Sequence, residues 1–344
     1  MDWEKWCLRV GAAAVCCALV LRLFSGGFFD WMLQSLTSPE MVSAIVFMET
    51  GRVLRPAVEQ TQPPETTSAT VPEETESQST EANAEQPQPT EPAYAVFAEE
   101  DAQLVEVNSV CGYDADLPTL LQKPLSWDLK KEEPTVLILH THGTESYTPN
   151  GKYTESSAYR TLDTGYNVVA VGAELAKVLE AGGVKVVHDT VMHDHPSYSG
   201  SYNHARKSIQ AYMQEYPSLM MVLDIHRDSV ENSDGEQVRY SVQTDGGTSA
   251  KLMMVVGTDA NGLKHPNWPD NMALAVKLHA QLEKTNPGIC RPISFRSQRF
   301  NQDLSAGAML IEVGSAGNTH EEALLAAQIL GQAILDISHG TIGS

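Results

Sequence analysis

Histidines and acidic residues follow or end three short apolar runs of this sequence. His142 and Glu145 lie in HTHGTE, directly after the run 136–139, and His226 lies in DIHRD at the end of a second run. Glu312 stands inside a third run, MLIEV, where a carboxylate without a partner would be costly to bury. Two imidazoles and a carboxylate are usual protein ligands of a hydrolytic zinc ion, and a further carboxylate can take a proton from water. The sequence therefore contains the parts of a zinc hydrolase site.

Structural roles are the competing interpretation of the same residues. A histidine at the end of a strand commonly makes only a structural hydrogen bond, and spacing alone leaves this alternative open for His140, His142 and His226. Three further histidines, in VVHDTVMHDH, are predicted to lie in a surface loop, and the alternative is that they support the site or bind substrate. No G-x-S-x-G, GxxxxGK[ST] or GxGxxG motif is present, which disfavours a serine hydrolase and a nucleotide site.

An alternation of apolar runs and helically spaced segments must position these residues. The strands at 238–242 and 252–256 are predicted to pair with each other across the turn DGG. The alternation predicts an α/β fold with a mixed, mostly parallel sheet and helices on both faces. The carboxyl ends of parallel strands, where such folds bind ligands, share one edge of the sheet. The other predicted strands are 135–139, 184–187, 219–225 and 308–313, and the predicted helices are 167–181, 203–215, 271–283 and 320–337.

The residues before this domain differ from it in composition. The apolar segment WCLRVGAAAVCCALVLRLF, with an arginine near each end, reaches the length of about 20 residues that spans a bilayer, and no clear cleavage site follows it. A later tract rich in Glu, Thr, Pro, Gln and Ser is nearly free of apolar residues, which predicts disorder. The predicted organisation is a transmembrane anchor at 1–29, a membrane-proximal helical segment at 30–55, a disordered acidic linker at 56–101, a lead-in at 102–133 and the catalytic domain at 134–344. The protein is expected to cross the cell membrane once, with its catalytic domain outside the cytoplasm.

Charge and cysteine usage exclude some classes of function. The 344 residues carry a formal net charge of -21 at pH 7, which argues against a nucleic-acid partner. Three of the five cysteines, Cys7, Cys16 and Cys17, lie in the apolar N-terminal segment. No CxxC or Cys/His metal spacing is present, so neither a disulfide framework nor a cysteine-based metal site is expected.

Four segments, in order, resemble the stage II sporulation protein P family: HTHGTESYT from His140, VLDIHRDS from Val222, VVGTDANGLKHPNW from Val255 and RFNQDLSAGAMLIEVGSAGNT from Arg299. The resemblance covers the chain from about Val136 to its end. That family is similar to the zinc-dependent N-acetylmuramoyl-L-alanine amidases, which implies an amidase-like fold. It also implies a membrane-anchored peptidoglycan hydrolase that acts in engulfment during endospore formation, at the forespore septum or engulfing membrane.

The resemblance implies a role for individual residues. His142 and His226 match zinc ligands, and Glu312 matches the catalytic glutamate. Glu145, within HTHGTE, is the expected third ligand. Asp163 is the alternative, because it stands where the broader amidases have a glutamate before the first long helix. Supporting or substrate-binding roles are expected for His140, Arg227, Asp228, His265, Asn267 and Asn301. Arg227 and Asp228 could orient His226. Arg227 or His265 could stabilise the oxyanion that forms during hydrolysis.

The resemblance also implies a reaction and partners. Zinc and Glu312 would hydrolyse the amide between N-acetylmuramic acid and L-alanine, and the family is also credited with cutting peptide cross-links. Peptidoglycan, the membrane and the stage II sporulation proteins D and M are the expected partners. Two alternatives remain open at this point: a non-catalytic wall-binding scaffold, and a zinc peptidase that acts on peptides free of sugar.

Overall fold

The computed structural model describes residues 97–125, 128–149 and 159–339, all within the compact unit Gln86–Ser344. The predicted anchor at 1–29 and the helical segment at 30–55 lie outside the described residues, as does the linker as far as residue 96. Among the residues that are described, no helix combines the length and apolarity needed to cross a membrane. Residues 97–101, predicted as the end of the linker, belong instead to the folded part: the 3-10 helix η1 spans Glu99–Leu104 and its Asp101 pairs with Lys284 at 3.0 Å.

A seven-stranded sheet forms the centre of the molecule, in the order β1-β8-β7-β9-β4-β2-β3. Every neighbouring pair is parallel except β7 and β9, which are antiparallel, so the predicted mixed and mostly parallel sheet is confirmed. The strands are β1 (Val107–Ser109), β2 (Val136–Leu139), β3 (Val186–His188), β4 (Met221–Asp228), β7 (Leu252–Val256), β8 (Ile293–Phe295) and β9 (Gly307–Ser315).

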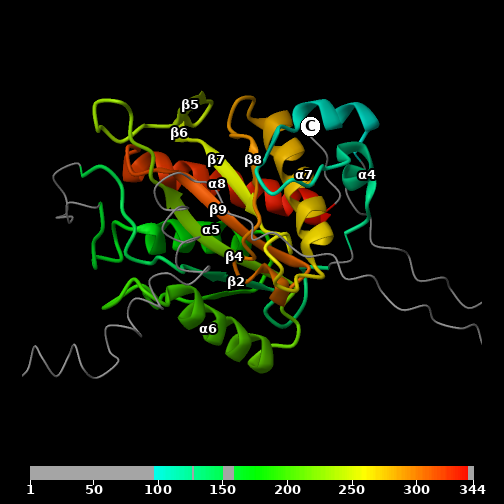
Figure 1. Cartoon of the computed structure of the whole chain (residues 1–344), viewed down its shortest axis with the longest axis horizontal. Coiled ribbons are helices and arrows are strands. Elements are labelled where there is room, and N and C mark those ends of the chain that lie inside the picture. Colours follow the sequence, from blue (N-terminus) through cyan, green and yellow to red (C-terminus); the bar gives the residue numbers. More distant parts are fainter. Residues whose placement is uncertain (1–96, 126–127, 150–158, 340–344) are drawn as a thin grey trace, which may run out of the picture. The chain divides into compact units, whose positions relative to one another are not determined.

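Helices cover both faces of the sheet unequally. Alternate residues of β2, β4 and β9, among them Ile138, Ile225 and Ile311, pack in one core with three long helices. The opposite side chains, such as Leu139 and Val222, pack in a second, smaller core with one helix only, which lies along the lower side of Figure 1. The larger face is covered by α5 (Val168–Ala181), α7 (Trp268–Thr285) and α8 (His320–His339), and the smaller by α6 (Ser201–Glu215). The remaining helices of the described residues are α4 (Leu117–Gln122) and the short 3-10 helix η2 (Gln302–Leu304).

The predicted hairpin between 238–242 and 252–256 is wrong. The antiparallel pair is β5 (Ser241–Thr244) with β6 (Gly247–Ala250), and it forms a separate two-stranded sheet. Leu252–Val256 joins the large sheet instead, antiparallel to β9. The turn DGG does connect two strands, but the second is shorter and closer than predicted, because Gly247 at φ 119° already begins it.

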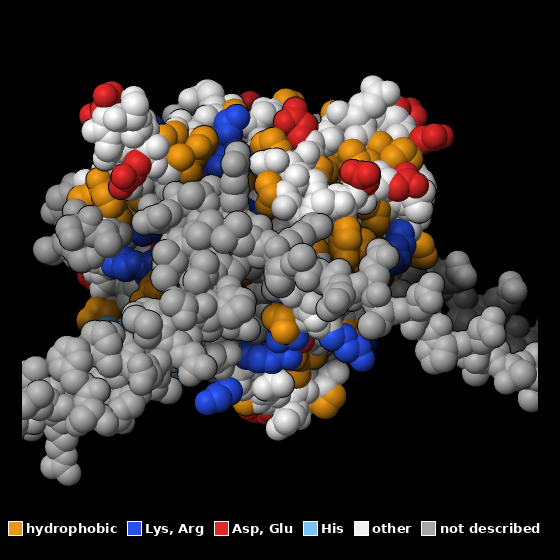
Figure 2. All heavy atoms as spheres, in the orientation of Figure 1, with side chains coloured by type: hydrophobic (Ala, Val, Ile, Leu, Met, Phe, Trp, Pro, Cys, Tyr) orange, Lys and Arg blue, Asp and Glu red, His pale blue; other side chains and the backbone are white. Residues whose placement is uncertain are grey.

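Charge is unevenly spread over the surface. On the face shown in Figure 2, Lys and Arg side chains gather low on the molecule, whereas Asp and Glu side chains lie mostly along the upper rim. Figure 1 places α6 in the lower region, and this helix carries Arg206 and Lys207. The strongly negative net charge of the chain therefore does not extend over the surface around α6.

Candidate functional site

Three strands bring His142, His226 and Glu312 together on the face that α6 covers. His226 on β4 and Glu312 on β9 are register partners, so their Cα atoms lie on neighbouring strands about 4.8 Å apart. Strand alternation sends both side chains to the face opposite Ile225 and Ile311. His142 arrives from the turn after β2, and its ring centroid lies 5.2 Å from that of His226 at 86°. The sequence prediction that these strand ends converge is confirmed.

Glu145 is fixed by the same turn and lies against His226. Its Oε2 is 3.6 Å from His226 Nδ1 and accepts a hydrogen bond from the backbone N–H of Arg227 at 3.2 Å. Arg160 Nη2 donates to its Oε1 at 3.3 Å. The backbone of Glu145 is held as well, because its carbonyl accepts from the N–H of Val168 at the start of α5. The first long helix and the strand end therefore position this carboxylate jointly.

Asp224 supports the site in a way that the sequence analysis did not predict. Its two oxygens accept from Thr141 N at 2.8 Å and Thr141 Oγ1 at 2.6 Å. Its Oδ1 also lies 2.9 Å from His226 Nε2. The sequence offered two candidates, because Asp224 and Asp228 each lie two residues from His226 and residues two apart on a strand share a face. The register of β4 against β9 shifts between His226 and Asp228, and Asp228 pairs with Arg291 instead.

A segment between β3 and α6, residues 189–200, closes over the turn of His142; we call it the strap. Asp194 in the strap is buried and accepts hydrogen bonds from Thr144 N at 3.2 Å and Thr144 Oγ1 at 2.6 Å. Arg160 Nη1 donates to the same carboxylate at 2.6 Å. Tyr198 stacks on His142 with ring centroids 4.5 Å apart and an angle of 10°. The strap thus fixes the orientation of the His142 ring.

Aromatic side chains form the wall of the site on the α6 side. Tyr202, in the first turn of α6, lies 6.5 Å from the His226 ring at 17° and 5.6 Å from the His142 ring at 87°. Phe300 packs on Tyr202 at 5.9 Å. No feature of the sequence pattern pointed to these aromatic residues, since they reach the site from loops and from a helix start.

The two carboxylates of the site have opposite acid strengths. Burial raises the pKa of Glu312 to about 8, and the negative charge of Glu145 adds to this effect against the attraction of His226. Burial also acts to raise the pKa of Glu145, but Arg227 and the neighbouring histidines outweigh it and hold that pKa well below its usual value. Glu145 is therefore a fixed negative charge, and Glu312 is a group that can hold a proton near neutral pH, which is the pairing expected of a ligand and a general base.

The pKa values of His142 and His226 are also shifted in opposite directions. Burial lowers the pKa of His142 to about 4, so its imidazole is neutral and free to donate a lone pair. Burial acts to lower the pKa of His226 as well, but Asp224 and Glu145 outweigh it and raise that pKa well above 6.5. A positive charge is therefore favoured between Asp224 and Glu145, where a metal cation would replace the proton.

The residues present fit a zinc ion in their chemistry. His142 Nδ1 and Glu312 Oε2 are buried and have no hydrogen-bond partner, which is rare for buried polar atoms and commonly marks an absent ion or water. His226 Nε2 is held by Asp224 Oδ1 at 2.9 Å. Within the described part of the chain, no group of three or more His, Cys, Asp or Glu side chains is already arranged to hold a metal ion. The donor set of two imidazoles and one carboxylate is nevertheless that of hydrolytic zinc.

The alternative ligand Asp163 lies apart from these groups. Its side chain is exposed, and its Oδ1 accepts from the backbone N–H of Gly165 at 3.0 Å. His140 points away as well: it is fully buried, with Nδ1 3.1 Å from Ile225 O and Nε2 2.9 Å from His188 Nε2. Gly172 makes room for this pair, since a Cβ there would lie 2.5 Å from His140 Cε1. His140 therefore binds the backbone of β4 and the side chain of His188.

The histidines of VVHDTVMHDH are not a surface loop as predicted. His193 is buried and lies 3.1 Å from the buried Asp189, and His188 is half-buried against His140; only His195 is exposed. The polar composition of this segment predicted that it would be exposed to solvent. In the structure, residues in the turns after β2 and β3 provide hydrogen-bond partners for these polar side chains.

Arg227 and Asp228 do not contact His226 through their side chains as predicted for an orienting role. Arg227 Nε donates to Ser146 O and its Nη2 to Tyr159 O, each at 2.8 Å, so this side chain braces the Glu145 turn. Asp228 accepts from Arg291 Nη1 at 2.7 Å. Arg227 Nη1 also lies 3.9 Å from Glu145 Oε1, so the guanidinium supports this carboxylate as well as its turn.

His265, Asn267 and Asn301 lie around the loop before β9. The charged groups nearest His265 are Asp303, Arg299 and Asp259, and Asn267 Nδ2 donates to Asp303 O at 2.9 Å. Asn301 Nδ2 donates to the carbonyl of Tyr202 at 2.8 Å, so this residue holds the aromatic wall.

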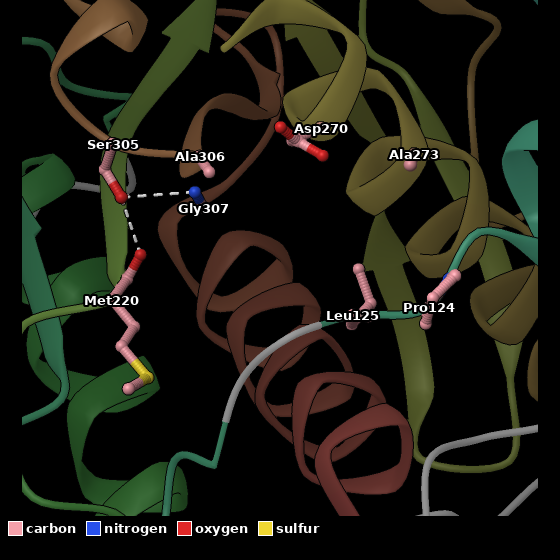
Figure 3. A pocket seen from close by; sticks show the side chains of 8 residues that line it. All are labelled: Pro124, Leu125, Met220, Asp270, Ala273, Ser305, Ala306 and Gly307. Atoms are coloured by element: carbon pink, nitrogen blue, oxygen red, sulfur yellow. Dashed lines mark hydrogen bonds between the residues drawn. The ribbon is translucent and has the colours of Figure 1, made fainter. Parts of the chain in front are cut away.

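A cavity of about 290 Å³ at the other end of the strands is separate from this chemistry. It lies at the amino ends of β4 and β9, where Ser305 Oγ donates to Met220 O at 2.7 Å and accepts from Gly307 N at 3.1 Å, as Figure 3 shows. Its lining is largely apolar, and Asp270 is its single carboxylate. The groups able to perform hydrolysis are at the opposite edge of the sheet.

Comparison with known proteins places the chain in a family. The family model Stage II sporulation protein P (SpoIIP) matches residues 34–335. Stage II sporulation protein P of Bacillus subtilis (strain 168) is 28% identical over 207 residues, which are 57% of this chain and 49% of that protein. The chain thus matches about half the length of this relative.

Solved structures of amidases are similar to this chain at lower sequence identity. The CwlD amidase from Clostridioides difficile, solved in complex with the GerS lipoprotein, is 13% identical with a TM-score of 0.38, covering 59% of this chain and 98% of that one. The catalytic domain of CwlV, an N-acetylmuramoyl-L-alanine amidase from Bacillus (Paenibacillus) polymyxa var. colistinus, is 15% identical with a TM-score of 0.36, covering 59% and 95%. Since the family model spans most of its length, the chain belongs to the stage II sporulation protein P family.

Proposed function

We propose that this protein is a zinc-dependent peptidoglycan hydrolase of sporulation, which cleaves the amide between N-acetylmuramic acid and L-alanine. One observation carries the proposal: His142, Glu145, His226 and Glu312 meet at one edge of the sheet, and His142 and Glu312 present buried atoms without a partner. Membership of the sporulation family supports the biological setting.

The side chains divide the work of hydrolysis between holding a metal and moving a proton. His142, His226 and Glu145 would hold zinc, which lowers the pKa of a water and polarises the amide carbonyl. Glu312 takes the proton of the attacking water and passes it to the leaving amine. The charge of a bound cation favours the carboxylate form of Glu312, whose pKa of about 8 without it would otherwise favour the acid.

The remaining parts of the function belong to the same proposal. Residues 1–29 would anchor the protein in the cell membrane, and the acidic linker that follows would let the catalytic domain reach the wall outside the cytoplasm. Engulfment at the forespore septum, a second activity on peptide cross-links, and cooperation with the stage II sporulation proteins D and M are the expected context. Cell fractionation of a sporulating culture, with and without residues 1–29, tests the anchor by the appearance of the protein in the membrane fraction.

Purified cross-linked peptidoglycan tests the activity directly. The full-length protein is incubated with it, with added zinc or with a chelator, and the products are identified by mass spectrometry. Free stem peptides that disappear with the chelator and with Glu312→Ala are the expected result. Uncross-linked muropeptides in addition would establish the endopeptidase.

The two alternative functions predict other products. A wall-binding scaffold would pull down with peptidoglycan but release nothing, and Glu312→Ala would bind equally well. A peptidase that needs no sugar would cleave free stem peptides as fast as intact peptidoglycan. Release of stem peptides that persists in the presence of the chelator would exclude the metal mechanism.

A further inference from the structure

The hydroxyl group of Tyr202 is the strongest candidate for an additional catalytic group. Its ring lies parallel to His226 at 6.5 Å and edge-on to His142 at 5.6 Å, so the phenol borders both proposed zinc-binding imidazoles. The hydroxyl has no hydrogen-bond partner among the described residues, although the backbone carbonyl of Tyr202 accepts from Asn301. A phenol in such a place has a hydrogen bond to offer to a ligand.

The Tyr202 hydroxyl is a hydrogen-bond donor at neutral pH, because a tyrosine phenol ordinarily has a pKa of about 10.

The loop opposite α6 holds Tyr202 in place at some conformational cost. Phe300 and Asn301 are consecutive non-glycine residues in the left-handed region, with φ 50° and 59°. Such conformations persist only where the surroundings impose them, and they are concentrated at functional sites. Here Phe300 packs on the Tyr202 ring, and Asn301 binds the Tyr202 carbonyl.

Hydrogen bonds anchor this loop on both sides. Arg206 of α6 donates to both oxygens of Asp303, at 2.8 and 2.7 Å. The Gln302 side chain bridges the backbone of β7, where it accepts from Gly257 N and donates to Val255 O, each at 2.8 Å. The ring of Tyr202 is therefore fixed by two elements, as a group that must not move during a reaction would be.

We infer that the Tyr202 hydroxyl donates a hydrogen bond to the carbonyl oxygen of the amide as it becomes an oxyanion, an inference that rests on the proposed function. In that step a C–O bond forms between water and the carbonyl carbon, and the C–N bond then breaks. The water proton passes through Glu312 to the leaving nitrogen, and Tyr202 keeps its own proton throughout. Two other donors were considered for this role. Arg227 donates to Ser146 O and Tyr159 O, and His265 lies by the loop before β9 with Asp303, Arg299 and Asp259 around it.

Tyr202→Phe removes the hydroxyl and keeps the ring contacts. With the zinc-loaded full-length protein and purified peptidoglycan, we expect kcat to fall roughly 100- to 1,000-fold, as for loss of one oxyanion donor, with KM little changed. Bound zinc, measured by elemental analysis, and the unfolding temperature should stay at wild-type values. A phosphinate analogue of the amide, which mimics the oxyanion, should bind the variant about 100-fold more weakly in calorimetry.

Tyr212→Phe is the matched control. Tyr212 lies about three turns farther along α6 than Tyr202, and its variant should retain kcat within a few-fold. Full kcat in Tyr202→Phe, or a loss that follows the zinc content or the unfolding temperature, would overturn the inference. Wild-type protein that neither hydrolyses peptidoglycan nor binds the phosphinate would instead overturn the proposed function itself.

Discussion

Glu312 combines a strand position with an acid strength that an exposed glutamate does not have. Because it is the proposed proton carrier, Glu312→Gln should lower kcat roughly 10²- to 10⁴-fold while zinc content and folding are preserved. Stem-peptide release, followed by mass spectrometry, measures the effect. Glu231→Gln, an exposed carboxylate beyond β4, is the control and should be fully active. A Glu312→Gln protein of normal activity would remove Glu312 from the mechanism.

Glu145 and Asp163 can be separated as zinc ligands by metal content alone. Glu145→Gln should lose most of the bound zinc, because the Glu145 carboxylate lies 3.6 Å from His226 Nδ1. Asp163→Asn should keep it, because Asp163 is exposed and bonded only within its own turn. Elemental analysis after dialysis provides the measurement. Equal zinc loss in both variants, or loss in Asp163→Asn alone, would contradict the choice of Glu145.

Part of the site could be predicted at the scale of single residues. His142, Glu145, His226 and Glu312 were visible because polar groups at the end of an apolar run are unusual, and parallel strands bring their ends together. The aromatic wall and the strap were not visible. Tyr198 and Tyr202 reach the site through the path of a loop, which no periodicity of the sequence encodes.

The strap is the element whose attachment should matter most for stability. Asp194 is buried and receives hydrogen bonds from Thr144 and Arg160. Asp194→Ala leaves these donors unpaired and should lower the free energy of unfolding by about 3 kcal/mol. Urea denaturation of the full-length protein measures this change.

An exposed ion pair provides the comparison for that measurement. Lys177 lies 3.2 Å from Glu174 on the outside of α5, and its side chain is 74% exposed. Lys177→Ala should change the free energy of unfolding by about 0.5 kcal/mol or less. If Asp194→Ala had as small an effect, the strap would not be held by this carboxylate.

At the scale of helices and strands, the long and apolar elements were predicted from the sequence, and short strands such as β1 and β8 were missed. The runs that became β2, β4 and β9, and the helices α5 to α8, stand out in the sequence because each buries a full face or core strand. The strands β1 and β8 have three residues each and leave no pattern to detect. The place of β7 was missed because its partner β9 lies more than 50 residues away, whereas turn chemistry reports only neighbours in sequence.

At the scale of the whole molecule, buried neutral histidines should make stability depend on pH. Burial lowers the pKa of His265 to about 4, whereas in the unfolded chain it is about 6.5. Between these values the unfolded state binds the extra proton, so stability is complete above pH 6.5 and decreases as the pH falls towards 4. A loss on the order of 2 kcal/mol is expected from this residue between pH 7 and 4.5.

Unfolding by urea at pH 7, 5.5 and 4.5 tests this dependence. His265→Phe should show a shallower decline than the wild type, since it has no proton to gain on unfolding. His195→Phe, at an exposed histidine of the strap, should follow the wild type. Parallel curves for wild type and His265→Phe would show that His265 does not contribute.

The position of β9 within the sheet has a consequence for the folding of the chain during its synthesis. Among the described strands β9 comes last in sequence, yet it lies between β7 and β4 and carries Glu312. A nascent chain therefore lacks both the middle of its sheet and its proposed base until β9 has been made. Three groups separated by more than 80 residues each, His142, His226 and Glu312, meet only when β9 inserts. On the proposed function, a copy that stops before β9 should release no stem peptides.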